Sequence, residues 1–213
     1  MFGYNVAVWL ATSIIIPCAV GIIYFEKLPM PYKLIVALLI LGFFTELMLV
    51  IVPYIGIKNY FGSHIYGLLE IVLLSLFFIN LLKNPKEKRM IWIIMIGLSV
   101  FALGYSISGN NILEFNSLPR ALECIYFSLI SCYLFYKMSI DLRTMDESIY
   151  FVNGSIFFYF SSSFLVFAFS NYKAHDSDDL LVMYNVHSIV NALCNLAYAP
   201  GLWIASKSSY SAA

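Results

Sequence analysis

The residues with the clearest chemical potential in this sequence are ionisable side chains that lie inside long apolar stretches. A charged group surrounded by lipid is costly unless it is paired, protonated or hydrated. Such groups therefore favour a polar site in the protein interior, and Glu46 and Glu70 favour a functional role over simple packing. The ionisable residues of this kind are Glu46, His64, Glu70, Arg120, Glu123 and His187.

The last apolar stretch carries the strongest single pattern. Its polar residues recur at helical spacing and share a stripe roughly 100° wide on a helix. A polar face along a membrane helix must look into the protein or into water, so this helix is expected to line a cavity. Asn191 and Asn195 have a second interpretation, as interhelical hydrogen-bond clamps. The stripe consists of Tyr184, His187, Ser188, Asn191, Asn195 and Tyr198.

Two of the remaining groups also have structural alternatives. Arg120 and Glu123 are three positions apart, a spacing that allows an ion pair on one helix. That pair either seats its helix at the membrane rim or contacts a ligand. His64 stands near the start of its apolar stretch, where an interfacial imidazole without a ligand is the simpler interpretation.

Three kinds of chemistry can use this set of residues. Acids, an imidazole, amides and tyrosines around a cavity suit a small polar or cationic ligand, and acids shielded from water can exchange protons. The third is a metal, since zinc sites often combine two histidines with a carboxylate. No HExxH or comparable spacing supports a metal, so the cofactor stays unknown. The side chains that would bind one are His64, His187, Glu70 and Glu46.

The elements that position these residues follow from composition. The chain is 62% hydrophobic and 11% charged, whereas soluble domains carry about 25% charged residues. A membrane helix needs about 20 mostly apolar residues, and seven stretches qualify. We expect an all-α polytopic integral membrane protein, a seven-transmembrane-helix bundle that forms a single membrane domain over residues 1–213. The predicted helices cover about 5–24, 33–54, 63–82, 90–108, 118–137, 149–170 and 180–204.

Basic residues set the orientation, because Lys and Arg resist translocation. Nine of the twelve lie in one alternating set of connections and three in the other. The N-terminus is therefore predicted outside and the C-terminus in the cytoplasm, in a bacterial inner membrane or a plasma membrane. At about 1.5 Å of rise per residue, the ionisable groups then share one level in the outer half of the bilayer. Helices 2, 3, 5 and 7 are expected to line a pocket that opens outward.

The net charge and the cysteines limit which partners and metals the protein is expected to bind. The net charge is zero and no basic tract occurs, which argues against nucleic acid as a partner. The four cysteines lie inside predicted helices without metal-type spacing, so we interpret them as free, buried thiols. Pro200 is expected to end or bend the last helix.

The function that these patterns favour is a small-ligand sensor or receptor-like protein that signals to a separate cytoplasmic partner. The ligand-binding residues predicted for it are Glu46, His64, Glu70, Arg120, Glu123, Tyr184, His187, Asn191 and Asn195. A transporter or proton-coupled carrier is the first alternative, although the inner halves look too apolar for a continuous polar path. A structural membrane subunit and a metal-dependent intramembrane enzyme are further alternatives. No catalytic residue is assigned, and a binding protein is favoured over an enzyme.

Overall fold

A computed structural model of the chain describes residues 10, 12–51, 60–108, 116–140, 147–169 and 177–208, with side chains described for 10, 12–48, 61–108, 116–140, 147–168 and 185–208. Every regular element in this described part is helical, which confirms the all-α bundle. Six helices are long and apolar enough to cross a membrane, and a shorter one precedes them. The elements are η1 Thr12–Ile14, α2 Ile15–Ile23, η2 Phe25–Lys27, α3 Met30–Ile51, α4 Tyr60–Leu81, α5 Pro85–Ile107, α6 Ser117–Ile140, α7 Ser148–Phe169 and α8 Ser177–Ser208.

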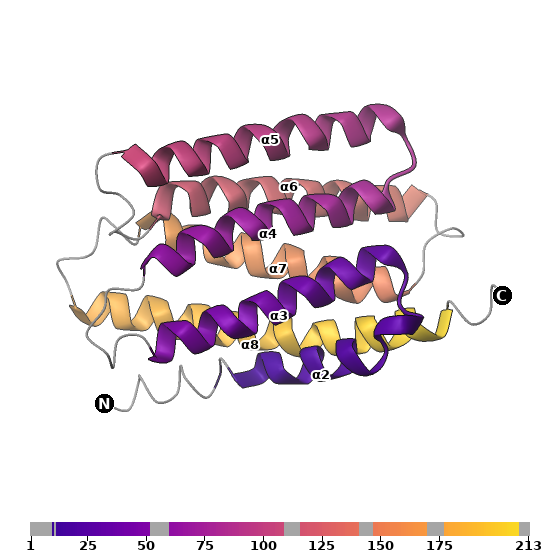
Figure 1. The fold of residues 1–213 in the computed structure, drawn as a ribbon, viewed down its shortest axis with the longest axis horizontal. Coiled ribbons are helices and arrows are strands. Elements are labelled where there is room, and N and C mark those ends of the chain that lie inside the picture. Colours follow the sequence, from indigo (N-terminus) through magenta and orange to yellow (C-terminus); the bar gives the residue numbers. More distant parts are fainter. Residues whose placement is uncertain are drawn as a thin grey trace.

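The helices run alternately up and down along one axis (Figure 1). Helix α2 packs against α3 and α8, α3 against α4, α4 against α6, α6 against α7, and α7 against α8. These six helices form a closed ring. Helix α5 lies outside the ring against α4 and α6, and its buried residues are only Ile91, Met95 and Ala102. A peripheral helix with an apolar outer face fits a membrane environment.

Local sequence explains where α5 begins. The Asn84 side chain accepts a hydrogen bond from the Lys86 backbone N–H at 2.9 Å, and Pro85 follows at the first helical position. Both are typical of a helix start. The helix therefore begins five residues before the predicted position 90, because the capping residues are polar and lie outside the apolar stretch.

Two other sequence expectations need correction. Pro200 does not end the last helix, since α8 continues to Ser208; a proline deletes only one backbone donor, and Gly201 directly after it packs closely against α7. All four cysteines are free, but Cys132 is exposed on the outer surface of α6 whereas Cys18, Cys124 and Cys194 are buried. The first predicted helix, 5–24, is described only in part, because residues 1–9 lie outside the described part.

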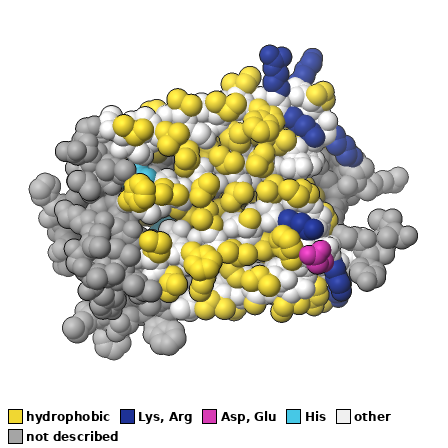
Figure 2. Space-filling view, viewed as in Figure 1, with side chains coloured by type: hydrophobic (Ala, Val, Ile, Leu, Met, Phe, Trp, Pro, Cys, Tyr) yellow, Lys and Arg dark blue, Asp and Glu magenta, His cyan; other side chains and the backbone are white. Residues whose placement is uncertain are grey.

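All described Lys and Arg side chains except buried Arg120 gather at one end of the bundle (Figure 2). They lie where α3 and α5 begin and where α4, α6 and α8 end, and they are Lys27, Lys33, Lys83, Lys86, Lys88, Arg89, Lys137 and Lys207. We call this the basic end. The asymmetry agrees with the predicted orientation, in which this end faces the cytoplasm. The orientation itself stays a prediction.

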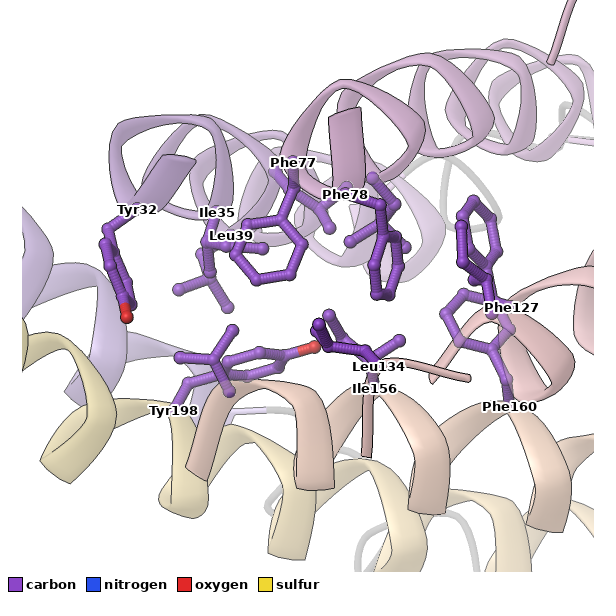
Figure 3. Packing of buried hydrophobic residues seen from close by; sticks show 14 of the residues in the cluster. Tyr32, Ile35, Leu39, Phe77, Phe78, Phe127, Leu134, Ile156, Phe160 and Tyr198 are labelled. Atoms are coloured by element: carbon purple, nitrogen blue, oxygen red, sulfur yellow. The ribbon is translucent and has the colours of Figure 1, made fainter. Parts of the chain in front are cut away.

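A dense apolar core fills the ring (Figure 3). Phe77 and Phe78 on α4 meet edge to face at 5.2 Å between ring centroids, and Phe127 on α6 lies 4.8 Å from Phe160 on α7. Phe77, Phe78 and Phe127 are fully buried. Aromatic pairs of this kind add specific geometry to the burial of apolar surface, so the core fixes the relative rotation of α4, α6 and α7.

Candidate functional site

A cavity of about 160 Å³ lies between the helices of the ring. Its polar groups cluster toward the end of the bundle that is opposite the basic end. Glu46 is five residues before the last residue of α3, and Arg120 is three residues after the first residue of α6. Polar and apolar side chains both line it. The lining residues are Ile14, Leu38, Leu39, Gly42, Thr45, Glu46, Ser63, Tyr66, Glu70, Leu74, Asn116, Arg120, Tyr159, Phe160, Phe167, His187, Asn191, Cys194, Asn195 and Tyr198.

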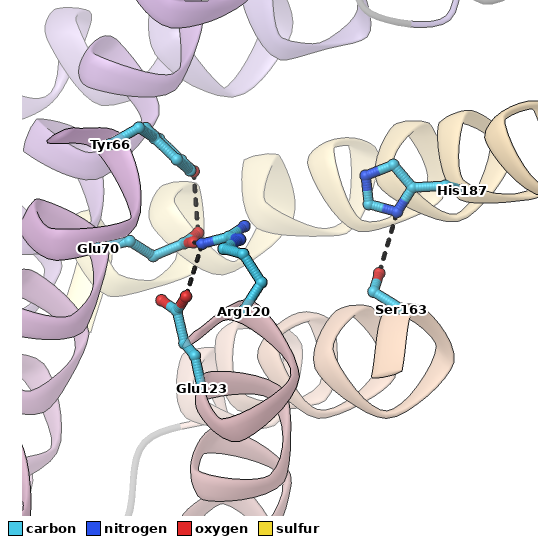
Figure 4. A network of polar contacts seen from close by, with 6 residues as sticks. All are labelled: Tyr66, Glu70, Arg120, Glu123, Ser163 and His187. Carbon is cyan, nitrogen blue, oxygen red and sulfur yellow. Dashed lines mark hydrogen bonds and ion pairs between the residues drawn. The ribbon is translucent and has the colours of Figure 1, made fainter. Parts of the chain in front are cut away.

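One guanidinium nitrogen connects an acid on the cavity wall with a second acid behind it (Figure 4). Arg120 Nη1 donates to Glu123 Oε2 at 2.6 Å on the same helix and also forms an ion pair with Glu70 Oε2 on α4. Tyr66, one turn before Glu70, donates its hydroxyl to Glu70 Oε1 at 2.8 Å. The three charged side chains are each less than 8% exposed. We call Glu70, Arg120 and Glu123 the charge cluster.

Aromatic rings and a glycine enclose the arginine. The guanidinium carbon of Arg120 lies 5.0 Å from the ring centroid of Phe167 and 5.6 Å from that of Tyr66, within the range of cation–π attraction. A Cβ added at Gly67 would lie 3.5 Å from Arg120 Nη1, in ordinary van der Waals contact, so α4 packs closely against this side chain. Asn116 accepts the Arg120 backbone N–H through its carbonyl oxygen at 3.1 Å. The first turn of α6 thus holds Arg120 at the cavity.

Glu46 supplies a second acidic group, from α3 on the same cavity wall. It is half-buried, and within the described part of the chain it has no hydrogen-bond or ion-pair partner. Together with Glu70, it makes two carboxyl groups on the cavity wall, and Glu123 adds a third behind that wall. The cavity is therefore an acidic environment that contains unpaired carboxyl oxygen.

The polar stripe of the last helix turns toward the cavity. His187, Asn191, Asn195 and Tyr198 line it. His187 Nδ1 lies 3.1 Å from the Ser163 hydroxyl, and its ring packs 5.2 Å from that of Phe167. Asn195 donates to the Ser13 hydroxyl at 3.1 Å, so it acts as an interhelical clamp in addition to lining the cavity.

Two predicted site residues lie off the cavity wall, and a third is not described. The side chain of Tyr184 is outside the described residues. His64 is buried and its Nδ1 lies 2.7 Å from the Ser106 hydroxyl on α5, away from the residues that line the cavity. Glu123 lies behind the wall and reaches the cavity only through Arg120. Ligand binding by any of the predicted residues stays a prediction.

The metal interpretation finds no ready ligand set. No group of three or more His, Cys, Asp or Glu side chains that could hold a metal ion occurs among the residues described by the structure. His187 contacts a serine and two aromatic rings, and His64 contacts Ser106.

Several cavity residues were not predicted from the sequence. Tyr66 could have been identified, because it precedes Glu70 by four positions and therefore shares its helical face. Tyr159, Phe160 and Phe167 gave no signal, since aromatic residues in an apolar helix equally suit the core or the lipid. They place α7, the sixth predicted helix, in the cavity wall, whereas only helices 2, 3, 5 and 7 were expected to line it.

Between the cavity and the basic end, the interior is mostly apolar. Fully buried Phe77, Leu134 and Leu202 belong to the core cluster. A few polar side chains are buried there as well: Asn153 donates to the Ser131 carbonyl at 3.1 Å, while Asn153 Oδ1 and the Ser131 hydroxyl have no hydrogen-bond partner among the described residues. These groups lie among large apolar side chains, so the floor of the cavity is mainly apolar.

Comparison with known proteins found no relative with which the cavity residues could be compared. No protein-family model matches the chain, and neither the curated proteins nor the solved structures contain a match.

Proposed function

We propose that this membrane-helix bundle is a receptor-like protein whose cavity binds a small organic cation. The observation that carries the proposal is Glu46, a half-buried carboxyl on the cavity wall without a partner in the described part of the chain. A carboxylate shielded from water needs an opposite charge or a proton. A ligand ammonium group beside Glu46 would provide the missing charge.

The remaining cavity wall supports the same ligand class. Arg120 already has two acidic partners, so an anionic ligand would have to compete with Glu70 and Glu123 and approach three carboxyl groups. Tyr159, Phe160 and Tyr198 add aromatic surface, which attracts organic cations through the ring face. A cavity of about 150 Å³ accommodates benzene, so this one fits an ammonium ion with one small ring or a short branched chain.

The apolar floor favours a receptor-like role over a carrier. A carrier needs polar groups on the route to the second membrane face, whereas Phe77, Leu134 and Leu202 fill the described interior between the cavity and the basic end. In the predicted orientation the cavity faces the outside. Ligand-dependent changes in helix packing would then reach a separate cytoplasmic partner at the basic end.

Thermal unfolding of the purified protein tests binding with three probes of matched shape, benzylammonium, benzyl alcohol and benzoate. We expect benzylammonium to stabilise the wild type most. The Glu46→Gln variant should bind it about 10- to 100-fold more weakly, because a charge-assisted hydrogen bond contributes about 1.5–3 kcal/mol. Glu26→Gln is the matched control, since Glu26 is exposed in η2 and lies outside the cavity.

Two outcomes would contradict the proposal. The first is that none of the three probes stabilises the wild type. The second is that Glu46→Gln keeps the wild-type preference for benzylammonium.

A further inference from the structure

The charge cluster contains one more acid than base. Glu70, Arg120 and Glu123 are buried together, and arginine stays protonated in proteins. With both carboxyl groups ionised, the cluster would carry a net negative charge inside the membrane. Two carboxyl groups that share one site do not both ionise readily, so the cluster needs one additional positive charge.

The hydrogen bonds indicate which carboxyl group is the ionised one. Glu70 accepts from Tyr66 at one oxygen and from Arg120 at the other, an arrangement suited to a carboxylate. Glu123 accepts from Arg120 at Oε2 only, and its Oε1 is buried without a hydrogen-bond partner. A neutral hydroxyl without a partner costs less to bury than an unpaired charged oxygen.

We propose that Glu123 holds a proton while the cavity is empty, and that a cation entering the cavity releases this proton to water. The ligand brings the positive charge that the proton supplied before. The O–H bond of Glu123 breaks, its electron pair stays on the carboxylate, and the proton leaves through the cavity that Glu70 lines. Release on cation binding rests on the proposed function; the proton site does not.

The groups around the cluster support this assignment. Among the residues that line the cavity in the described part of the chain, Glu46 on α3 is the one further carboxyl group outside the cluster. The other titratable side chains that interact electrostatically with the cluster are neutral in their ordinary forms and come from α4, α6, α7 and α8: Tyr66, Cys124, Tyr159, His187 and Tyr198. None of them supplies a cation except through protonation of His187, whose ring is held by Ser163, Tyr159 and Phe167.

Infrared spectroscopy tests the proton site without any ligand. A protonated carboxyl has a C=O stretch that is separate from the carboxylate bands and shifts on exchange into heavy water. Because Glu46 has no counter-charge in the described part of the chain while the cavity is empty, and would hold a proton of its own, all variants are compared in a Glu46→Gln background. At neutral pH this background should show the band, adding Glu123→Gln should remove it, and adding Glu26→Gln should leave it unchanged.

Glu70→Gln provides a second test that does not depend on how well Glu123→Gln folds. With Glu70 neutral, Arg120 faces a single carboxyl group, so Glu123 should ionise and the band should again disappear. A Glu46→Gln background without the band would overturn the proposal. A band that survives in both Glu123→Gln and Glu70→Gln would overturn it as well.

The release step is tested with benzylammonium in a weakly buffered solution that contains a pH indicator. The wild type should acidify the solution as it binds the probe, whereas Glu123→Gln should release fewer protons for each probe molecule bound. Equal proton release by the wild type and Glu123→Gln would overturn the coupling. Absence of benzylammonium binding, with the infrared band still present, would contradict the proposed function and leave the proton site standing.

Discussion

Arg120 and Glu70 are fifty positions apart in the sequence and form a buried ion pair between α6 and α4. The same nitrogen of Arg120 also holds Glu123. Because α4 and α6 are neighbours in the helix ring, this contact joins the two halves of the chain at the cavity. It accounts for how this helix bundle keeps a charged site inside its interior.

Removing the arginine should be strongly destabilising. Arg120→Gln leaves the buried carboxylate of Glu70 without a counter-charge, and loss of one partner of a buried ion pair costs about 3–5 kcal/mol. The double variant Arg120→Gln, Glu70→Gln should recover part of this loss, because it also removes an uncompensated acid. The free energy of unfolding in detergent measures both effects. A double variant no more stable than the single variant would argue against the ion pair.

The hydroxyl of Tyr66 should contribute more to the free energy of unfolding than the tyrosine hydroxyl that bonds a glutamate at the basic end. Tyr66→Phe removes a hydrogen bond to buried Glu70, and such bonds to charged groups contribute about 1.5–3 kcal/mol. Tyr133 also donates to a glutamate, Glu87, at 2.7 Å. Glu87 retains Lys137 as a partner. Because polar contacts at an exposed surface contribute less than about 1 kcal/mol, Tyr133→Phe should lower the free energy of unfolding by less than that amount. Equal losses of unfolding free energy in the two variants would contradict the role given to burial.

Close approach of α8 to α7 depends on Gly201. A Cβ at this position would lie 2.8 Å from Val152 Cγ2 and 3.3 Å from the Ser148 backbone oxygen. Since backbone cannot easily move away, Gly201→Ala should destabilise the protein by about 1–3 kcal/mol. Gly97→Ala is the matched control on α5, where a Cβ meets nothing within 4 Å. Thermal unfolding should separate the two variants clearly; a harmless Gly201→Ala would show that the helices are not in tight contact.

The orientation is predicted by the distribution of Lys and Arg. A reporter that is active only in the cytoplasm should be active when it is fused after residue 213, and a reporter that is active only outside should not be. The physical reason is that the basic end resists translocation. The opposite pattern would place the cavity toward the cytoplasm and exclude an external ligand.

The sequence was sufficient for the helix bundle, because long apolar stretches have few alternatives in a membrane. It was also sufficient for the Arg120–Glu123 pair, which local helix geometry dictates and which the structure confirms at 2.6 Å. The inward-facing residues of the last helix could be predicted for the same reason. In each case the information lies within a single helix.

Contacts between helices could not be obtained in this way. The pairing of Arg120 with Glu70, the His64–Ser106 contact and the position of Phe167 at the cavity depend on how the helices rotate against one another. For α6 and α7, packing between Phe127 and Phe160 in the core contributes to that rotation. The residue spacing within a single helix does not predict such a contact. Charged residues indicated which helices surround the cavity, and so α7, which carries no charge in its described span, was overlooked.

The central claim is that the cavity opens outward and prefers cations, and cysteine labelling tests it most directly. Thr45 lines the cavity next to Glu46, and within the described part of the chain its hydroxyl donates to the Leu41 carbonyl of its own helix and to nothing else. Thr45→Cys, in a background with the four native cysteines replaced by alanine, should react from outside with a membrane-impermeant trimethylammonium thiosulfonate. The reaction should be faster than with the sulfonate analogue, and benzylammonium should protect the thiol. Labelling only from the cytoplasmic side, or faster labelling by the anionic reagent, would contradict the account.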